Sequence, residues 1–340
     1  MDVAVVILNY NGVKFLKQFL PAVIMHSQNA TVYVADNCST DNSVDFLKEN
    51  FPDIKLILND KNGGFAKGYN DALQHVKADY YVLLNSDIEV TPNWIQPCID
   101  LLEEDMSIAA LQPKVLAYHN KQKFEHAGAA GGFLDKDFYP FCQGRIFNDV
   151  EVDSNQYNKS KEVFWATGAC LFIRAELYHQ FGGLDDSFFA HMEEIDLCWR
   201  LKQQGHKIYY CADSTIYHVG GGTLNYDNPK KTYLNFRNSL YMMTKNYEGI
   251  LFFKIFKRLL LDGLAGAMFI VKFQFNHFWA LIRAHFTYYA NLGQLLKKRK
   301  KIKQNRTHFN RVGLYSKSII FKKYFGGVKK FTDINQSDFN

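Results

Sequence analysis

The stretch YYVLLNSDIEV, residues 80–90, is an apolar run that breaks off at Asn85, Ser86 and Asp87 and then resumes. A short apolar run rich in aromatic and branched residues is typical of a strand that is buried on both faces. The predicted strand therefore ends on a carboxylate at the point where it leaves the core. This position raises the question of what the carboxylate of Asp87 binds.

Strand patterns and helix patterns alternate on the N-terminal side of this stretch. They run strand 3–10, helix 13–26, strand 31–37, helix 40–51, strand 54–60, helix 65–76 and strand 80–87. This alternation predicts right-handed βαβ units and a parallel sheet that is covered by helices on both faces. In sheets of this kind, ligands bind at the carboxyl ends of the strands.

Polar residues follow three of the predicted strands. They are Asn9, Tyr10 and Asn11, then Asp36, Asn37 and Ser39, and finally Asn85, Ser86 and Asp87. Because the carboxyl ends of parallel strands meet at one edge, we expect these side chains to line one site. Asp36 can accept a hydrogen bond from a nucleobase there, and Tyr10 can stack on the base. The alternative role of each residue is turn formation or helix capping.

Three glycines lie in the stretch NDKNGGFAKGYNDAL, residues 59–73. Gly63, Gly64 and Gly68 leave room for the backbone to approach a ligand closely just before a helix begins. This arrangement suits a nucleotide sugar or its diphosphate, and a plain turn is the alternative. The stretch is neither the GxGxxG dinucleotide fingerprint nor a Walker A loop, so it does not indicate a nicotinamide dehydrogenase.

The composition is that of a folded globular protein, with 340 residues of which 47% are hydrophobic and 22% charged. This length predicts about two domains, or one α/β domain with an appendage. The six cysteines are scattered and form no CxxC pair, so we expect reduced thiols. The N-terminus starts directly in a strand pattern without the basic region of a signal peptide, and we therefore expect a cytoplasmic location.

Charge is distributed unevenly along the chain. Residues 251–340 hold 18 Lys and Arg against 3 Asp and Glu, whereas residues 1–250 hold 22 against 31. The C-terminal part also contains apolar segments, which Asp262, Lys272 and Arg283 interrupt. A transmembrane helix needs about 20 largely uncharged residues, so the pattern favours amphipathic helices that lie on an anionic membrane surface.

Aromatic side chains and a basic run would hold these helices on the membrane. The aromatic residues are Phe269, Phe273, Phe275, Phe278, Trp279, Phe286 and Tyr288. The basic run is KKRKK, residues 297–301, which would attract anionic head groups. The alternative is that the helices pack on the main domain and that the basic tail is simply solvated.

Seven sequence blocks in order resemble the family 2 glycosyltransferases, whose nucleotide-sugar fold is called GT-A. The blocks are VVILNYNG, VADNCSTDNSVDFL, NDKNGGFAKGYNDAL, VLLNSDIEV, WATGACLFIRAE, FFAHMEEIDLCWRL and YHVGGGT. The resemblance runs from about residue 1 to about residue 245. It implies a GT-A domain over residues 1–248, with a Rossmann-like mixed sheet flanked by helices, and a basic, amphipathic helical region over residues 249–340.

The resemblance implies a metal site and a donor site. It places Asp87 at the end of the family's Asp-x-Asp motif, where a carboxylate holds Mn²⁺ or Mg²⁺ against the donor diphosphate. Asn85 stands where the first Asp of that motif would be. His218 matches the family's late metal-ligand histidine, with a merely packed histidine as the alternative. The implied donor-binding residues are Tyr10, Asn11, Asp36, Asn37, Gly63, Gly64, Gly68, Asn70, Asn85 and Ser86.

The same resemblance implies a general base near the start of a helix that is predicted from about Ile195. Glu194 aligns with the general-base position, where Asp is more usual, and Glu193 is the alternative. We expect Asp196 or Glu193 to cap the helix, since the helix dipole favours carboxylates there.

Acceptor-binding residues are expected in the Gly- and aromatic-rich part of the chain. These are Trp165, Thr167, Gly168 and His191, and an edge hairpin with structural aromatics is the alternative for the region from residue 124. Lys230, Lys231 and Arg237 are expected near the diphosphate, either as part of a donor lid or as a basic helix face.

The expected activity is inverting transfer of a sugar from a UDP- or dTDP-linked donor to a glycan or lipid-linked glycan in bacterial cell-surface polysaccharide synthesis. The blocks lean toward rhamnosyltransferase-like members. We expect a peripheral position on the inner face of the cell membrane and no nucleic-acid partner. One alternative is a processive synthase, but its long apolar spans and Gln-x-x-Arg-Trp motif are missing. The other is an inactive sugar-binding relative, which would have lost Asp87, Glu194 or His218.

Overall fold

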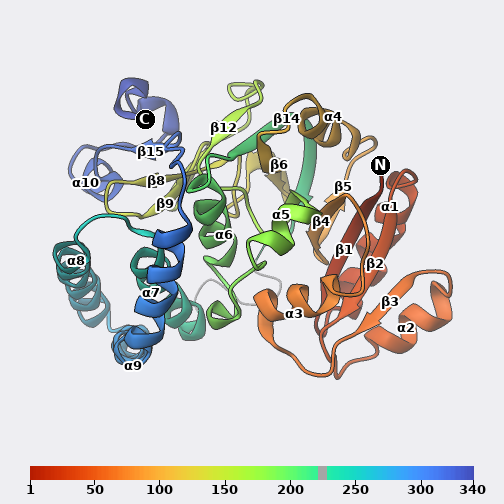
Figure 1. Ribbon diagram of the computed structural model, residues 1–340, viewed down its shortest axis with the longest axis horizontal. Coiled ribbons are helices and arrows are strands. Elements are labelled where there is room, and N and C mark those ends of the chain that lie inside the picture. Colours follow the sequence, from red (N-terminus) through yellow and green to blue (C-terminus); the bar gives the residue numbers. More distant parts are fainter. Residues whose placement is uncertain (221–227) are drawn as a thin grey trace.

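The computed structural model describes residues 1–220 and 228–340. Its first part alternates strands and helices as predicted (Figure 1). The elements are β1 (Val3–Asn9), α1 (Val13–His26), β2 (Thr31–Asp36), α2 (Ser43–Asn50), β3 (Lys55–Leu58), α3 (Gly64–Leu73) and β4 (Tyr80–Asn85). Strands β3, β2, β1 and β4 pair side by side and are all parallel, which confirms the predicted βαβ arrangement.

The central sheet becomes mixed in its second part. The elements there are β5 (Ile88–Val90), α4 (Gln96–Glu104), β6 (Ile108–Ala117), β7 (Asn120–Phe124), β12 (Lys161–Val163), β13 (Cys170–Arg174), α5 (Ala175–Gln180), α6 (Glu193–Lys202) and β14 (Lys207–His218). Strand β13 runs antiparallel between β4 and β6. The full order is β12-β14-β6-β13-β4-β1-β2-β3, with β5 paired to β14 and β7 to β6.

The sheet has a hydrophobic cluster on each face. In β1, Val5 and Ile7 belong to the cluster that includes Leu16 of α1, whereas Ala4 and Val6 belong to the cluster that includes Tyr69 of α3. Successive side chains of a strand point to opposite faces, so a strand that is apolar throughout fits a sheet covered on both sides. This two-sided burial explains why the apolar runs predicted the strands well.

A second, five-stranded sheet lies beside the first. It consists of β8 (Gly132–Asp135), β9 (Pro140–Cys142), β10 (Arg145–Ile146), β11 (Asp149–Val150) and β15 (Leu314–Tyr315), in the order β11-β10-β9-β8-β15. The last segment of the chain includes α10 (Ile319–Tyr324) and packs on this sheet. The rings of Phe133 and Phe141 pack against those of Phe331 and Phe339 in tilted or edge-to-face arrangements. The alternative of structural aromatics therefore holds for these two residues of the glycine-rich region.

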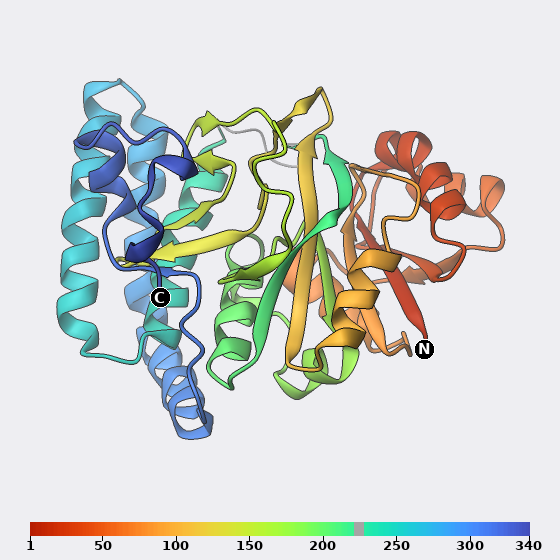
Figure 2. The ribbon, with the colours of Figure 1, turned by 90° about the horizontal axis from the view of Figure 1, so that it is seen from above.

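Three helices follow the central sheet: α7 (Pro229–Asn246), α8 (Leu251–Val271) and α9 (Phe275–Asn305). Helices α8 and α9 form an antiparallel hairpin at the side of the molecule opposite to α1 and α2 (Figure 2). None of the helices in the described ranges is long and apolar enough to cross a membrane. Helix α9 packs along α7 across the boundary predicted at residue 248, which stays a prediction.

Candidate active site

Asp87 and His218 lie side by side at the carboxyl end of the sheet. Strand β5 pairs antiparallel with the end of β14, and the register places His218 opposite Ile88. As a result, Nε2 of His218 lies 3.2 Å from Oδ1 of Asp87. The backbone N–H of Val219 donates to the carbonyl of Asp87 at 3.1 Å. Strand pairing thus brings together the two residues that the sequence proposes as metal ligands.

Glu125 follows β7 and contacts the other side of the His218 ring, with 3.1 Å between Oε2 and Nδ1. Burial disfavours the charged carboxylate, but the hydrogen bond and charge of His218 outweigh burial and lower the pKa of Glu125 to about 2. Burial also disfavours the imidazolium, but Asp87 and Glu125 raise the pKa of His218 to about 10. The two carboxylates therefore favour a positive charge between them, which either a proton on the ring or a cation bound to Nε2 would supply.

Two neighbouring glutamates begin α6, and an oxygen of each, Oε2, has no hydrogen-bond partner within the described ranges. Burial raises the pKa of Glu194 to about 7. Burial, together with the charge of Glu194, raises the pKa of Glu193 well above its ordinary value. Glu193 is 3% exposed, whereas Glu194 keeps partial exposure. Glu194 is therefore the glutamate suited to exchange a proton near neutral pH.

The predicted capping of this helix is not what the structure shows. Helix α6 starts at Glu193 rather than near Ile195, and no side chain caps it. Asp196 instead binds Lys245 at 2.8 Å and Arg200 at 2.9 Å inside the core. A fully buried carboxylate needs such cations, and they lie on the inner side of the helix, away from its free N–H groups.

The segment before α6 has a strained backbone. Phe189, His191 and Met192 have φ angles of 67°, 71° and 73°. Non-glycine residues in this left-handed region cost about 1–3 kcal/mol each and persist only where the surroundings hold them. The structure therefore has to supply contacts that fix this segment next to Glu194.

Helix α7 supplies most of these contacts through Asn238, which is fully buried. Its Nδ2 lies 2.9, 2.8 and 2.7 Å from the carbonyl oxygens of Phe188, Ala190 and His191. Arg237 of the same helix donates to the Phe188 carbonyl at 2.6 Å, and its expected place near the diphosphate stays a prediction. Asn238 thus fixes three carbonyls of the strained segment at once.

An ion-pair group extends this support to α9. Asp185 binds Lys245 of α7 at 2.5 Å and Lys298 of α9 at 2.6 Å. Burial acts against the Asp185 carboxylate, but the two lysines hold its pKa well below the usual range. The segment that leads into the glutamates is consequently tied to both C-terminal helices.

The predicted nucleobase end is organised by side-chain hydrogen bonds. Asp36 accepts from Nδ2 of Asn9 at 2.9 Å and from the backbone N–H of Ser39 at 2.8 Å. Asn11 accepts from the backbone N–H of Thr40 at 2.7 Å, and Tyr10 is 39% exposed. The residues that follow β1 and β2 therefore lie together, as predicted for one edge of the sheet.

The glycine stretch lies against the strained segment. A Cβ atom at Gly64, whose φ is 81°, would lie 2.4 Å from the carbonyl oxygen of Phe189. That oxygen accepts from the N–H of Phe65 at 2.6 Å. Asn37 donates to the Gly64 carbonyl at 3.0 Å and so connects the stretch to the end of β2. The close approach that Gly64 permits is therefore to the protein's own backbone.

The other predicted donor residues have identified places as well. Gly63 begins the turn into α3, and Gly68 packs on Leu8 of β1. Asn70 donates to the carbonyl of Leu184 at 2.6 Å, which fixes the chain before the strained segment. Asn85 and Ser86 lie at the end of β4, directly before Asp87.

Among the predicted acceptor residues, Gly168 and His191 lie near Glu194. A Cβ atom at Gly168 would lie 3.7 Å from Cβ of Glu194, whereas Trp165 and Thr167 are buried. The indole N–H of Trp165 donates to the carbonyl of Phe133 at 3.0 Å, so its ring belongs to the core. Nε2 of His191 has no partner within residues 1–220 and 228–340.

Two links join the metal-ligand side to the base side. The N–H of Asn85 donates at 2.9 Å to the carbonyl of Ala169, the residue after Gly168. Burial lowers the pKa of His191 to about 4, and the charge of Lys231 adds to the effect, while Glu125 interacts with the same lysine. These links connect the strand end before Asp87 with the loop at Gly168, and His218's partner Glu125 with His191, through intermediate residues.

A family model described as "Glycosyl transferase family 2" matches residues 4–181, just over half of the chain. The chain belongs to glycosyl transferase family 2. The resemblance seen in the sequence is thereby confirmed. The matched part of the glycosyltransferase includes Asp87 and most strands of the central sheet.

Curated relatives of this glycosyltransferase include two enzymes with rhamnosyltransferase in their names. The N-acetylglucosaminyl-diphospho-decaprenol L-rhamnosyltransferase of Mycobacterium tuberculosis is 23% identical over 231 residues, 63% of this chain and 75% of that protein. The rhamnosyltransferase WbbL of Escherichia coli is 24% identical over 156 residues, 43% of this chain and 57% of that protein. The low-salt glycan biosynthesis hexosyltransferase Agl10 of Haloferax volcanii is 22% identical over 246 residues, 70% of this chain and 74% of that protein.

Solved structures confirm the GT-A fold. GalNAc-T7 in complex with UDP, GalNAc and Mn²⁺ superimposes with a TM-score of 0.63 at 14% identity, covering 96% of this chain and 57% of that chain. The mannosyltransferase PcManGT of Pyrobaculum calidifontis, in complex with GDP-Man and Mn²⁺, gives a TM-score of 0.51 at 15% identity, covering 86% of this chain and 75% of that chain.

Asp87, directly before β5, and His218, at the end of β14, fit a divalent cation. Asp87 offers a carboxylate oxygen, and His218 offers a ring nitrogen whose partner nitrogen is fixed by Glu125. A carboxylate that orients a ligating histidine is a usual second-layer partner in metal sites. Within the described ranges no group of three or more ligating side chains has metal-site geometry. Phosphate oxygens and water would therefore have to supply the remaining ligands.

Glu125, Asn238 and Lys245 were not found from the sequence. Glu125 stands in the ordinary-looking run KFEHAG, and Asn238 and Lys245 lie in a helix with many polar residues. Their roles depend on contacts with residues that lie about 50 or more positions away in the chain, such as the 93-residue separation of Glu125 and His218. The residue pattern of one segment does not indicate a contact partner that lies so far away in the chain.

Proposed function

We propose that this glycosyltransferase transfers a sugar from a UDP- or dTDP-linked donor to a hydroxyl group of a glycan or lipid-linked glycan, with inversion at the anomeric carbon. The observation that carries the proposal is the Asp87–His218 pair at the carboxyl end of the sheet. Glu194, whose pKa burial raises to about 7, supplies the proposed base. The names of the rhamnosyltransferase relatives support a rhamnosyl donor and a product in bacterial cell-surface polysaccharide synthesis.

Glu194 acts as the general base in this proposal. Its carboxylate accepts the proton of the acceptor hydroxyl while the hydroxyl oxygen attacks the anomeric carbon and the bond to the diphosphate breaks. A single displacement of this kind inverts the configuration. Glu193 stays protonated, because burial and the neighbouring charge favour its neutral form. Neutral His191 has a free ring nitrogen, Nε2, with which to hydrogen-bond a sugar hydroxyl.

Asp87 and His218 would hold a divalent cation beside the leaving diphosphate. When bound there, Mn²⁺ or Mg²⁺ neutralises the charge that develops on the departing diphosphate. The imidazole nitrogen favours Mn²⁺, since Mg²⁺ prefers oxygen ligands. In this proposal Tyr10 and Asp36 would hold the nucleobase, and Ser86 and Gly63 would contact the diphosphate.

The proposed acceptor is lipid-linked, and the proposed location is the inner face of the cell membrane. The decaprenol in the name of the Mycobacterium tuberculosis relative supports such an acceptor. An enzyme that binds a lipid-linked glycan meets its acceptor more often when it is held on the membrane, because both reactants then share one surface. The exposed surface of helices α8 and α9 is relevant to this proposed location.

A donor screen tests the proposal. UDP- and dTDP-linked sugars, dTDP-rhamnose among them, are incubated with the enzyme, and release of nucleoside diphosphate is measured with and without Mn²⁺. We expect metal-dependent release from one donor, and the variant Asp87→Ala should lose both turnover and metal-dependent nucleotide binding. Equal turnover in the presence of a chelator would refute the metal role, and absence of turnover with nucleotide binding intact would favour an inactive sugar-binding relative.

A further inference from the structure

Large apolar side chains gather on the outer surface of the α8–α9 hairpin. More than half of the large apolar side chains that the described residues expose lie between residues 250 and 296. On α8 they include Phe252, Phe256, Leu260, Leu264 and Met268, which follow one another at intervals of four residues. Residues four apart lie on the same side of a helix, so these side chains form a continuous apolar stripe. A soluble surface rarely carries an apolar patch of this extent.

The polarity of α8 is reversed relative to an ordinary surface helix. Its buried positions are Arg258, Asp262 and Gly266. Nε of Arg258 lies 2.7 Å from Oδ1 of Asp262, and Nε2 of His285 on α9 lies 3.1 Å from the other oxygen. The charged side chains thus satisfy one another inside the molecule while the apolar ones face outward. A helix on a water-exposed surface has the opposite arrangement.

The charge around the stripe suits an anionic surface. Asp262 is the single acidic residue between positions 250 and 301, and it is buried. Lys272, at the turn between the helices, and Lys297, Lys300 and Lys301, near the end of α9, are exposed. The outer face of the hairpin therefore presents apolar groups and lysines but no carboxylate.

Three residues of the predicted membrane contact have other roles. Lys298 binds Asp185, and the guanidinium of Arg299 donates to the carbonyl of Thr244 at 3.1 Å. Tyr288 is buried, with its hydroxyl 3.0 Å from that of Thr244. They face α7 because α9 packs along α7 through this side. The attraction to lipid consequently depends more on apolar side chains, and less on charge, than the sequence indicated.

The tip of the hairpin lies next to the active site. The hydroxyl of Thr232, in the first turn of α7, is 2.7 Å from Nδ1 of His277 at the start of α9. The neighbouring residue Lys231 is the one whose charge acts on His191. Exposed Phe273 and Phe275 flank the turn between the helices. A surface that holds these phenylalanines would therefore lie close to the place where an acceptor enters.

We propose that the outer faces of α8 and α9 form a docking surface for a phospholipid bilayer, in which the stripe enters the boundary between head groups and acyl chains. The proposal rests on the proposed function, since it names the surface from which a lipid-linked acceptor would reach Glu194. Helix α8, with 21 residues, is about 31 Å long and would lie in the plane of the membrane.

Tryptophan fluorescence offers a direct test. Trp94, Trp165 and Trp199 are buried, whereas Trp279 on α9 is 64% exposed. We expect vesicles of phosphatidylcholine with phosphatidylglycerol to shift the emission of the full-length protein to shorter wavelength, and brominated lipids to quench it. The variant Trp279→Phe should lose both signals. Emission from the wild type that does not respond to these vesicles would refute the proposal.

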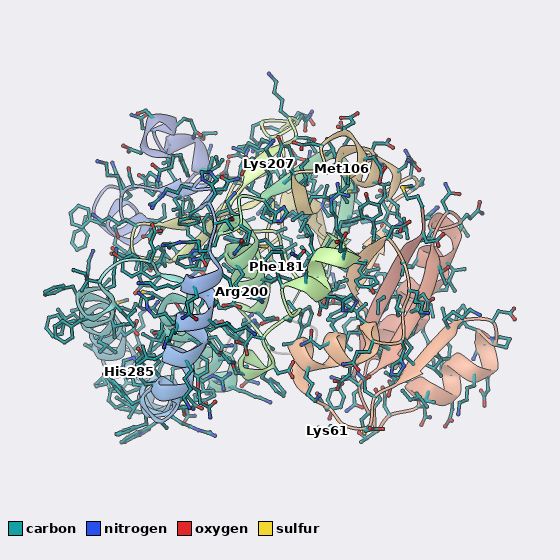
Figure 3. The ribbon with its side chains drawn as sticks, viewed as in Figure 1. Lys61, Met106, Phe181, Arg200, Lys207 and His285 are labelled. Atoms are coloured by element: carbon teal, nitrogen blue, oxygen red, sulfur yellow. The ribbon has the colours of Figure 1, made fainter. Side chains whose placement is uncertain are left out.

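Vesicle co-sedimentation measures the contribution of the stripe. The double variant Phe256→Ser/Leu264→Ser should lower partitioning about tenfold or more, because two large apolar side chains no longer enter the bilayer. The control Met25→Ser/Met106→Ser changes two equally exposed side chains on other elements, and in Figure 3 Met106 lies far from His285 of α9. It should bind like the wild type.

The remaining outcomes separate the bilayer from a second copy of the chain and from failure of the proposed reaction. If the stripe variants convert a dimer into a monomer without changing vesicle binding, the face is a subunit interface and the proposal is wrong. Donor turnover is measured in the same samples without vesicles. Vesicle binding without turnover by any donor would leave the docking surface standing and refute the proposed reaction instead.

Discussion

The ring of His218 is held between two carboxylates, with Nδ1 3.1 Å from Glu125 and Nε2 3.2 Å from Asp87. One carboxylate is a proposed metal ligand, and the other fixes the direction in which the ring nitrogen points. The arrangement makes Glu125 a positioning residue, since it would act on a bound cation through His218. Metal binding should therefore respond to a residue that does not touch the metal.

Glu125→Ala is expected to weaken Mn²⁺ binding about 10- to 100-fold, the usual cost of losing such an orienting partner. Titration calorimetry in the presence of UDP measures this affinity without turnover. Glu89→Gln is a suitable control, because Glu89 lies on β5 but pairs with Lys121 at the surface. Equal Mn²⁺ affinity in Glu125→Ala and the wild type would show that His218 needs no such partner.

Glu194→Gln keeps the size of the side chain but removes the base. We expect kcat to fall about 10²- to 10⁴-fold while donor affinity stays near that of the wild type. The matched variant Glu193→Gln should have a much smaller effect, because burial and the charge of Glu194 already favour the neutral form of Glu193. The reverse pattern would move the base to Glu193.

The pH dependence of kcat should report the same group. A base acts in its deprotonated form, and burial raises the pKa of Glu194 to about 7. The rate should therefore rise with pH and level off above about pH 7 to 8, and it should fall roughly tenfold per pH unit well below that value. A rate that is constant from pH 5 to pH 8 in the presence of saturating metal and donor would contradict this assignment.

Asn238→Ala removes the amide that holds three carbonyls of the strained segment. We expect a lower kcat with little change in UDP affinity, and a loss of stability of roughly 1–3 kcal/mol, since buried carbonyls lose their partner. Thermal unfolding and steady-state kinetics measure the two effects. As a control, Asn291→Ala removes a single hydrogen bond within α9. A variant that loses stability but keeps kcat and its pH profile would show a structural role alone.

The strands of the first half could be predicted because their signal is local. Each buried run, such as 80–85, is apolar on both faces, and the polar residues after β1, β2 and β4 meet at one edge because the strands are parallel. The positions of Asp87 and His218 follow from that edge and from the family resemblance. Their direct contact depends on the pairing of β5 with β14. This pairing joins segments more than 120 residues apart, and the sequence of neither segment indicates it.

The C-terminal region could be predicted less completely. The apolar and basic segments predicted helices and an outward-facing amphipathic surface, yet the same pattern does not tell which basic residue is exposed. Lys298 and Lys300 are both lysines and lie two positions apart on α9. Helical geometry turns Lys298 toward Asp185 and Lys300 toward solvent. Only the packing of α9 on α7 distinguishes them.

Strand β15 pairs with β8, which lies far earlier in the chain, and this pairing has a consequence for biosynthesis. The N–H of Ile319 donates to Asp135 across 184 residues of chain, and that of Phe331 donates to Glu151 across 180. While the ribosome is still making the last 30 residues, the small sheet lacks its edge strand and the rings of Phe133 and Phe141 have no covering partners. The small sheet therefore stays incompletely packed until residues 314–339 have been made and can pack on it. Long-range closure of this kind is slow and leaves apolar surface exposed during synthesis, when the partly made enzyme is most in need of a chaperone.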